Sequence, residues 1–154
     1  MPTADQELLG PAIEHATMRV PVAAPAESVA DVRATLASSR FDTAAAVAIL
    51  DGRSLAGLVS IEALLAAEGS AAIGSLMDTD PPVLKPGTDH EVAAREMARR
   101  GEATIAVTDA GGDFRGLVPP ERMLAVMLDE HDSDLARLGG FLAGALRSRR
   151  AAEE

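Results

Sequence analysis

The tetrapeptide Gly57-Leu58-Val59-Ser60 has a counterpart in Gly116-Leu117-Val118-Pro119, and the sequence around each is arranged in the same way. An apolar stretch that ends near an aspartate precedes each tetrapeptide, at residues 45–51 and 104–109. An Asp-Gly pair and a Gly-Gly pair, both typical of tight turns, separate these stretches from the tetrapeptides. We therefore predict two β-hairpins, each of which leads directly into a helix.

The similarity extends upstream of the hairpins, so that residues 18–65 align with residues 77–124. Each copy begins with a methionine and then a short extended apolar stretch, at residues 20–22 and 82–84. A proline follows each stretch and indicates a turn. The sequence is therefore an internal repeat with a period of about 60 residues.

A helix is predicted after the first turn of each copy, over residues 28–38 and 89–100, because apolar residues recur there at helical spacing. Thr88 and Glu91 are spaced as in a capping box, which predicts that the second of these helices starts at Thr88. Each unit is thus expected to run strand, helix, strand, strand, helix.

A unit of this size buries too little apolar surface to fold alone, so the two copies are expected to pack together. The predicted fold class is α+β, an α/β sandwich-like pair of β-α-β-β-α units related by a pseudo-two-fold axis and followed by an acidic helix. The expected segments are an N-terminal segment at 1–17, the first unit at 18–74, the second at 75–128, and the acidic helix with a basic tail at 129–154.

The composition excludes several classes of protein. Hydrophobic residues make up 47% and charged residues 25% of the chain, which suits a folded globular protein. The formal net charge of −10 argues against a nucleic-acid partner, because phosphates must be neutralised by basic side chains. The absence of cysteine excludes disulfides and thiolate metal sites.

Enzymatic signatures are also absent from the sequence. His15, His90 and His131 fall in three different predicted elements without metal-ligand spacing. Neither a nucleophile elbow nor a phosphate-binding loop is present. We predict that the chain is not an enzyme.

The doubled unit, with its Asp-Gly turn and its Gly-Leu-Val-Ser sequence leading into a helix, resembles a tandem CBS-domain pair over residues 13–130. Residues 128–140 are similar to the segment that follows the second CBS domain in MgtE-type magnesium transporters. This resemblance implies the cytosolic regulatory part of a transporter, a homodimer, and a transmembrane transport domain on the same chain if the chain is a fragment. It places the segment, itself soluble, at the cytoplasmic side of the membrane. The additional N-terminal helical domain of that family has no counterpart here.

In those transporters Mg²⁺ bound among acidic residues holds the closed form, and four acidic residues of this chain are the metal candidates by resemblance: Asp129, Glu130, Asp132 and Asp134. On a continuous helix, Glu130 and Asp134 share a face at i, i+4, where a cation or its water shell would relieve their repulsion. A solvated acidic helix end is the alternative. Asp78 and Asp80 belong to the same hypothesis with less support.

The resemblance also implies an adenine nucleotide, ATP or AMP. In CBS pairs that bind such nucleotides, the fourth position of the motif is usually Ser or Thr and the seventh is usually Asp. Here the fourth positions are Ser60 and Pro119, and the seventh are Ala63 and Arg122. Ser60 is therefore the weak nucleotide candidate, with a plain helix N-cap as its alternative. Arg122 is either a phosphate contact or a solvated surface charge.

The ends of the chain carry two further expectations. Residues 1–10 lack the pattern of a signal peptide. Arg147, Arg149 and Arg150 would suit the cytosolic end of a membrane span, or an ordinary basic tail. Two other functions stay open: a stand-alone CBS pair that binds a nucleotide, and a ligand-free dimerisation module.

Overall fold

The computed structural model describes residues 11–102, 104–125 and 127–128. Its helices and strands are, in chain order, α2 (Pro11–His15), β1 (Val22–Ala23), α3 (Val29–Ser38), β2 (Ala46–Asp51), β3 (Ser54–Ser60), α4 (Ile61–Ala66), the short 3-10 helix η1 (Ile73–Ser75), β4 (Val83–Leu84), α5 (His90–Arg100), β5 (Ile105–Thr108) and β6 (Phe114–Val118). Residues 120–125 and 127–128 are also helical. The predicted order of elements is confirmed in both copies.

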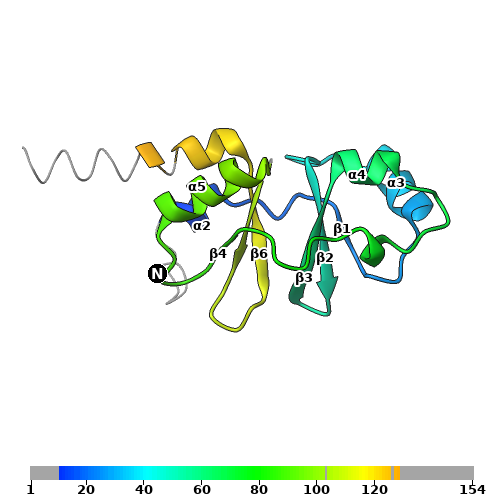
Figure 1. The fold of residues 1–154 in the computed structure, drawn as a ribbon, viewed down its shortest axis with the longest axis horizontal. Helices are drawn as coiled ribbons and strands as arrows, with labels where there is room; N and C mark the ends of the chain where they lie inside the picture. The colour runs from blue at the N-terminus through cyan, green and yellow to red at the C-terminus, as the bar shows by residue number, and fades with distance from the viewer. Residues whose placement is uncertain (1–10, 103, 126, 129–154) are drawn as a thin grey trace, which may run out of the picture.

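Each copy forms one three-stranded sheet, and the two sheets have the same topology. The first strand of each copy pairs in parallel with the second, which pairs antiparallel with the third. Figure 1 shows the two sheets side by side in the middle of the molecule, with α3 and α4 outside one sheet and α5 outside the other. This arrangement confirms the predicted α+β fold class.

The start of α5 differs from the prediction by one residue. The N-cap is Asp89, whose Oδ1 accepts hydrogen bonds from the N–H groups of Glu91 at 2.8 Å and of Val92 at 3.3 Å. The predicted capping box at Thr88 is wrong, because Thr88 Oγ1 accepts a hydrogen bond from Lys85 N–H instead. An aspartate carboxylate both accepts from the first N–H groups and complements the positive helix start, which favours it as the cap.

In each repeat, alternate residues of the strands form a hydrophobic core between the sheet and its helices. Val47 and Ile49 of β2 pack in a cluster with residues of α3 and α4, while Ile105 and Val107 of β5 pack in a cluster with residues of α5. All four side chains are fully buried. Because successive residues of a strand point to opposite faces, the residues between them face the other sheet.

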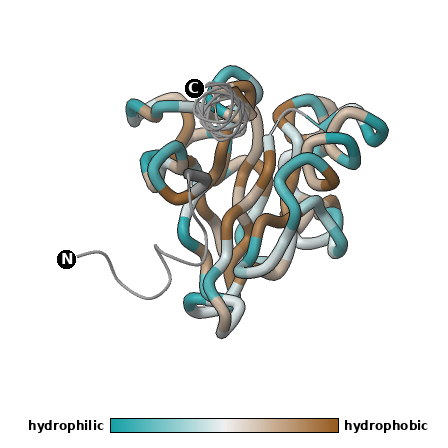
Figure 2. The backbone as a smooth tube through the Cα atoms, turned by 90° about the vertical axis from the view of Figure 1, so that its left-hand side faces the viewer, coloured by the Kyte–Doolittle hydropathy of each residue, from teal (hydrophilic) through white to brown (hydrophobic). Residues whose placement is uncertain are grey.

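The inner faces of the two sheets form a third core to which both repeats contribute. Its buried members are Val20, Ala46, Ala48, Leu58, Ala106, Phe114 and Leu117. Figure 2 shows hydrophobic positions along these inner strands and hydrophilic positions in the outer loops. Neither repeat could bury this face alone, so the two copies depend on one another for stability.

The segment that enters each repeat first pairs with the last strand of the other repeat. Thr17 and Leu117 of β6 exchange backbone hydrogen bonds at 2.9 and 3.0 Å, and Asp78 and Leu58 of β3 do so at 2.8 and 3.1 Å. These reciprocal contacts tie the two sheets together at equivalent places. They also require the glycine of each tetrapeptide, because a Cβ at Gly57 or Gly116 would collide with the backbone that crosses beside it.

The residues before the first repeat complete the second one. Ile13 and Ala16 pack against the core beneath α5, and Figure 1 shows α2 beside α5 in the half of the molecule that contains β4 and β6. The chain then crosses to the other half, where it forms β1. The N-terminal segment is therefore a structural part of the pair.

Candidate functional site

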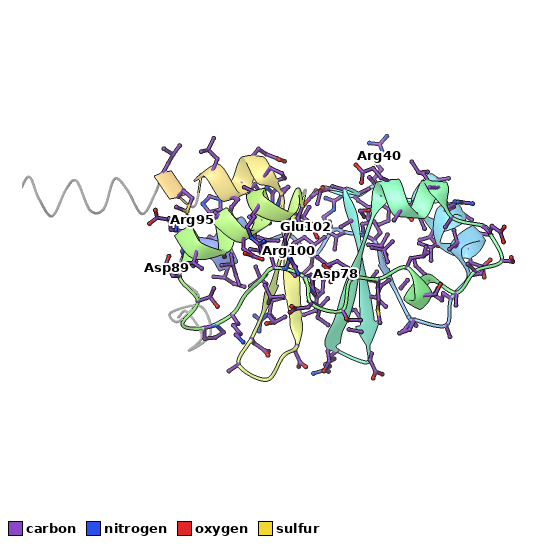
Figure 3. The ribbon with its side chains drawn as sticks, in the orientation of Figure 1. Arg40, Asp78, Asp89, Arg95, Arg100 and Glu102 are labelled. Atoms are coloured by element: carbon purple, nitrogen blue, oxygen red, sulfur yellow. The ribbon has the colours of Figure 1, made fainter. Side chains whose placement is uncertain are left out.

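A cavity of about 300 Å³ opens where the two repeats meet. We call it the first cleft, because one of its walls is formed by the junction of β3 and α4 in the first repeat. Its polar lining residues come from both repeats: Ser60, Glu62, Asp78, Arg100, Glu102 and Thr104. Figure 3 shows the labelled side chains of Asp78, Arg100 and Glu102 grouped at the centre of the molecule, between the two sheets.

Ser60 lies at the first turn of α4 and lines this cleft. Its Oγ accepts a hydrogen bond from Ala63 N–H at 3.2 Å, so the side chain caps the helix. The alternative interpretation of Ser60, a plain N-cap, is thus observed. A hydroxyl that accepts one hydrogen bond still has a hydrogen to donate, so capping and ligand contact are compatible.

Arg100 is the one cation among the residues that line the first cleft, and three carboxylates lie within 4 Å of its guanidinium. The guanidinium lies 3.5 Å from Asp78 Oδ2, 3.3 Å from Glu96 Oε1 and 3.9 Å from Asp80 Oδ2. It also donates a hydrogen bond to the Asp80 carbonyl oxygen. Asp78 and Asp80, the metal candidates with less support, both lie within 4 Å of this guanidinium.

Glu102 adds a second negative charge near Asp78. Burial raises the pKa of the Glu102 carboxyl above its usual range, and the negative charge of Asp78 raises it further, while Arg100 acts in the opposite direction. The ionised form of Glu102 is therefore less favourable in the folded protein than in water. A hydrogen-bond donor or a cation placed beside it would offset that cost.

Thr104 is the most deeply buried polar residue of the cleft. The residue is 2% exposed, and its hydroxyl has no hydrogen-bond partner among the residues that the structure describes. Within the same residues, no side-chain oxygen or nitrogen is both sealed from solvent and unpaired. The hydroxyl of Thr104 therefore remains open to the cavity that the residue lines.

At the equivalent place in the other half of the pair, charged side chains of the two repeats contact one another. Arg122 stands where the first repeat has Ala63, and its guanidinium lies 4.0 Å from Asp42 and donates a hydrogen bond to the His15 carbonyl oxygen at 3.4 Å. Asp42 also accepts a hydrogen bond from Thr17 Oγ1 at 2.6 Å. Arg122 thus makes a contact between the repeats while 40% of its side chain stays exposed, and its role as a phosphate contact stays a prediction.

The main metal candidates of the sequence lie outside the described residues: Asp129, Glu130, Asp132 and Asp134. The same holds for His131 and for the tail arginines Arg147, Arg149 and Arg150. Among the residues that are described, no group of three or more His, Cys, Asp or Glu side chains is arranged to hold a metal ion. His15 and His90 lie in different helices, α2 and α5, as predicted.

No helix in the described part of the chain is both long enough and apolar enough to cross a lipid bilayer.

Sequence reasoning missed Arg100 and Glu102 as residues of the first cleft and Asp42 as the partner of Arg122. A signal was present, because the aligned repeats place the loop before β2 and the loop before β5 in equivalent positions, each beside the end of a Gly-Leu-Val strand. Which of the charged residues in those loops turn toward the cleft depends on the packing between the repeats. That information is not contained in the periodicity of either copy.

Comparison with known proteins identifies the repeated unit. Residues 73–129 match the family model of the CBS domain. No curated protein sequence matches the chain. The second repeat therefore matches the CBS domain, and the first repeat shares its sheet topology.

Solved structures with the same fold include parts of magnesium transporters. The cytosolic domain of the Mg²⁺ channel MgtE in complex with ATP aligns with a TM-score of 0.67 at 24% identity, over 80% of this chain and 53% of that one. The soluble part of a magnesium transporter aligns with a TM-score of 0.65 at 20% identity, over 75% of this chain and 46% of that one. The chain thus spans about half the length of these two proteins.

A third similar structure is a protein of nearly the same extent. CBSX2 in complex with AMP aligns with a TM-score of 0.62 at 24% identity, over 77% of this chain and 96% of that one. The fold is therefore shared with CBS pairs from transporters and with others, and the chain resembles the cytosolic region of MgtE in fold.

Proposed function

We propose that this chain is the regulatory CBS pair of an MgtE-like divalent-cation transporter and that it adjusts transport to the intracellular Mg²⁺ concentration. The observation that carries the proposal is the similarity of fold to the cytosolic domain of the Mg²⁺ channel MgtE. The acidic stretch at residues 129–134 supports it from the sequence. The role is regulatory, with no catalytic step.

The proposed mechanism is relief of charge repulsion. The chain has a formal net charge of −10, and four carboxylates follow the helical residues 120–125 and 127–128 within a short distance along the sequence. Mg²⁺ is a hard cation that keeps several waters and needs only one or two carboxylates, so it would neutralise this stretch. Two subunits or subdomains could then approach closely, and they would separate again when the metal leaves.

The helical residues 120–125 and 127–128 connect the acidic stretch to the second repeat. Met123 is buried in the core beneath α5, and Met127 packs against the same core. A displacement of the residues that follow would therefore act on the second repeat. In the proposed assembly the pair is a homodimer on the cytosolic side of the membrane, and the transport domain belongs to the same polypeptide.

Small-angle X-ray scattering with and without Mg²⁺ tests the mechanism. The wild-type protein is expected to become more compact in Mg²⁺, whereas the double variant Glu130→Ala and Asp134→Asn should lose this response. The control Glu68→Ala and Asp51→Asn makes the same charge change at exposed positions of the first repeat and should keep it. Scattering profiles of wild type and double variant that are both unchanged by Mg²⁺ would reject the mechanism.

A second candidate function is a stand-alone CBS pair that binds an adenine nucleoside or nucleotide in the first cleft. The observation that favours it is the cavity itself, whose volume of about 300 Å³ lies at the lower end of the range of small-molecule sites. Isothermal titration with adenosine, AMP and ATP tests it. If a ligand binds in the first cleft, Ser60→Ala should weaken its affinity. No measurable heat with any of the three would reject nucleotide binding. A dimerisation module without a ligand would then be the remaining alternative to the Mg²⁺ proposal.

A further inference from the structure

We propose that the first cleft selects its ligand by charge and binds an adenine nucleoside more tightly the fewer phosphates the ligand carries. The expected order of affinity is adenosine, then AMP, then ATP. This inference rests on the second candidate function above and adds to it the chemical class of ligand. Four features of the cleft support it.

The first feature is the balance of charge around the cavity. Three carboxylates, those of Glu62, Asp78 and Glu102, belong to residues that line it, against the one guanidinium of Arg100. A phosphate that entered would approach more negative than positive charge. Because the cavity is partly closed off from water, such repulsion is screened less there than on an open surface.

The second feature is that Arg100 is already engaged. Its guanidinium lies within 4 Å of carboxylate oxygens of Asp78, Glu96 and Asp80, and its side chain is 28% exposed. To bind a phosphate, Arg100 would have to give up its interactions with Asp78 and Asp80, while Glu96 would keep its ion pair with Arg99. The guanidinium therefore neutralises the protein's own charges and has little attraction left for an anionic ligand.

The third feature is the weakness of the helix start beside the cleft. A long helix attracts anions through the unpaired N–H groups and the partial positive charge of its first turn. α4 has only 6 residues, so its dipole is small, and the Ser60 hydroxyl already accepts a hydrogen bond from Ala63 N–H. Glu62 adds a negative charge in that same first turn. This helix start offers a phosphate little compensation.

The fourth feature is the polar groups that remain available, which suit a neutral donor-rich molecule. Carboxylates accept hydrogen bonds, and the buried Thr104 hydroxyl can donate or accept one. The ribose hydroxyls and the amino group of adenosine are donors of the matching kind. Since burial and Asp78 already make the charge on Glu102 unfavourable, a neutral donor relieves that carboxyl, whereas a phosphate would make its situation worse.

Isothermal titration of the full chain with adenosine, AMP and ATP tests the inference. The titrations are run with a chelator, so that Mg²⁺ does not neutralise the phosphates. The Kd of ATP is expected to be larger than that of adenosine by roughly tenfold or more, with AMP between them. The difference should shrink at high salt, because the effect is electrostatic.

A pair of variants attributes the selectivity to the cleft. Glu102→Gln removes a charge of the cleft and keeps the size of the side chain, so it should bring the Kd values of ATP and adenosine closer together. Glu68→Gln removes the same charge at an exposed position outside the cleft and should leave their ratio unchanged. Circular dichroism confirms that both variants are folded before they are titrated.

The outcomes separate the inference from the function on which it rests. An adenosine-first order that Glu102→Gln weakens supports charge selection. ATP binding as tightly as adenosine, or more tightly, would overturn the inference and leave the nucleotide-binding function in place. If none of the three ligands binds, both are rejected, and the Mg²⁺ proposal stands unaffected.

Discussion

Arg122 of the second repeat lies 4.0 Å from Asp42 of the first, while Ala63, its counterpart in the first repeat, carries no charge. The same Asp42 carboxylate accepts a hydrogen bond from Thr17 at 2.6 Å, so three segments of the chain meet at one acidic side chain. This network makes the two halves of the pair unequal. At the start of the last helix, the first repeat places the uncharged Ala63 in the lining of the first cleft, whereas the second repeat places Arg122 in an ion pair with Asp42.

A double-mutant cycle should detect coupling between these two residues across the repeats. The Arg122 and Asp42 side chains are 40% and 33% exposed, so we expect a modest coupling energy of about 0.2–1 kcal/mol for Arg122→Ala and Asp42→Asn. Urea unfolding followed by circular dichroism measures it. The exposed pair of Arg95 and Glu91, within α5 alone, provides the reference cycle. A coupling of zero between Arg122 and Asp42 would show that this contact does not tie the repeats together.

The glycines of the two tetrapeptides are required by the crossing segments. A Cβ added to Gly57 would collide with the Asp78 carbonyl oxygen, and one added to Gly116 would lie 2.8 Å from the Thr17 carbonyl oxygen. Gly116 also has a φ of 136°, which side chains rarely adopt. Both glycines let the backbone from the other repeat approach closely.

Replacing either glycine by alanine should therefore destabilise the pair by about 1–3 kcal/mol, the usual cost of overpacking. Gly116→Ala is expected to be the more harmful, because it adds backbone strain to the collision. Gly111→Ala is the control, since its Cβ would make an ordinary contact of 3.5 Å. Thermal melts in which Gly57→Ala and Gly116→Ala match wild type would contradict this account of the crossing.

The central core should make the two repeats unfold as one body. Leu117 is fully buried between the sheets, so Leu117→Ala is expected to destabilise the protein by about 2–5 kcal/mol. The variant should still show a single transition by circular dichroism, because neither repeat can bury its inner face alone. Val92→Ala, at a position that is 58% exposed, should have little effect. Two separate transitions in the wild type would mean that the repeats fold independently.

The raised pKa of Glu102 predicts a pH-dependent stability. A folded protein that holds the Glu102 proton more tightly than the unfolded chain is favoured at low pH, and this contribution is lost as the pH rises above the ordinary pKa of a glutamate and through the raised pKa of Glu102. Glu102→Gln should therefore raise the melting temperature at neutral pH, with a gain that disappears in acid. A gain equally large at all pH values, or one matched by Glu68→Gln, would contradict the assignment.

The doubled architecture could be predicted from the sequence because each copy carries its own local signals. Apolar alternation, Asp-Gly and Gly-Gly turns and helical spacing are properties of short segments, and both copies show them at matching positions. The exact helix cap at Asp89 was missed, since Thr88 and Asp89 are both good capping residues and their choice depends on how the preceding turn closes.

The cleft could be predicted only in part. Ser60 follows from the motif, but the role of Arg122 depends on the Asp42 carboxylate that the first repeat brings near it, and the role of Arg100 depends on carboxylates elsewhere in its own repeat. Asp78 and Asp80 precede Arg100 by 22 and 20 residues and come near it only when α5 packs beside the start of its repeat. Such contacts join residues far apart in sequence, and no periodic pattern encodes them.

The most direct test of the Mg²⁺ response is a thermal melt followed by circular dichroism, first with a chelator and then with millimolar Mg²⁺ at matched ionic strength. A metal site filled to about ten times its Kd adds roughly 1.4 kcal/mol of stability, which should raise the melting temperature by a few degrees. The account predicts such a rise with Mg²⁺ and none with an equivalent amount of Na⁺ or K⁺. A melting temperature that Mg²⁺ leaves unchanged, or that Na⁺ raises equally, would contradict it.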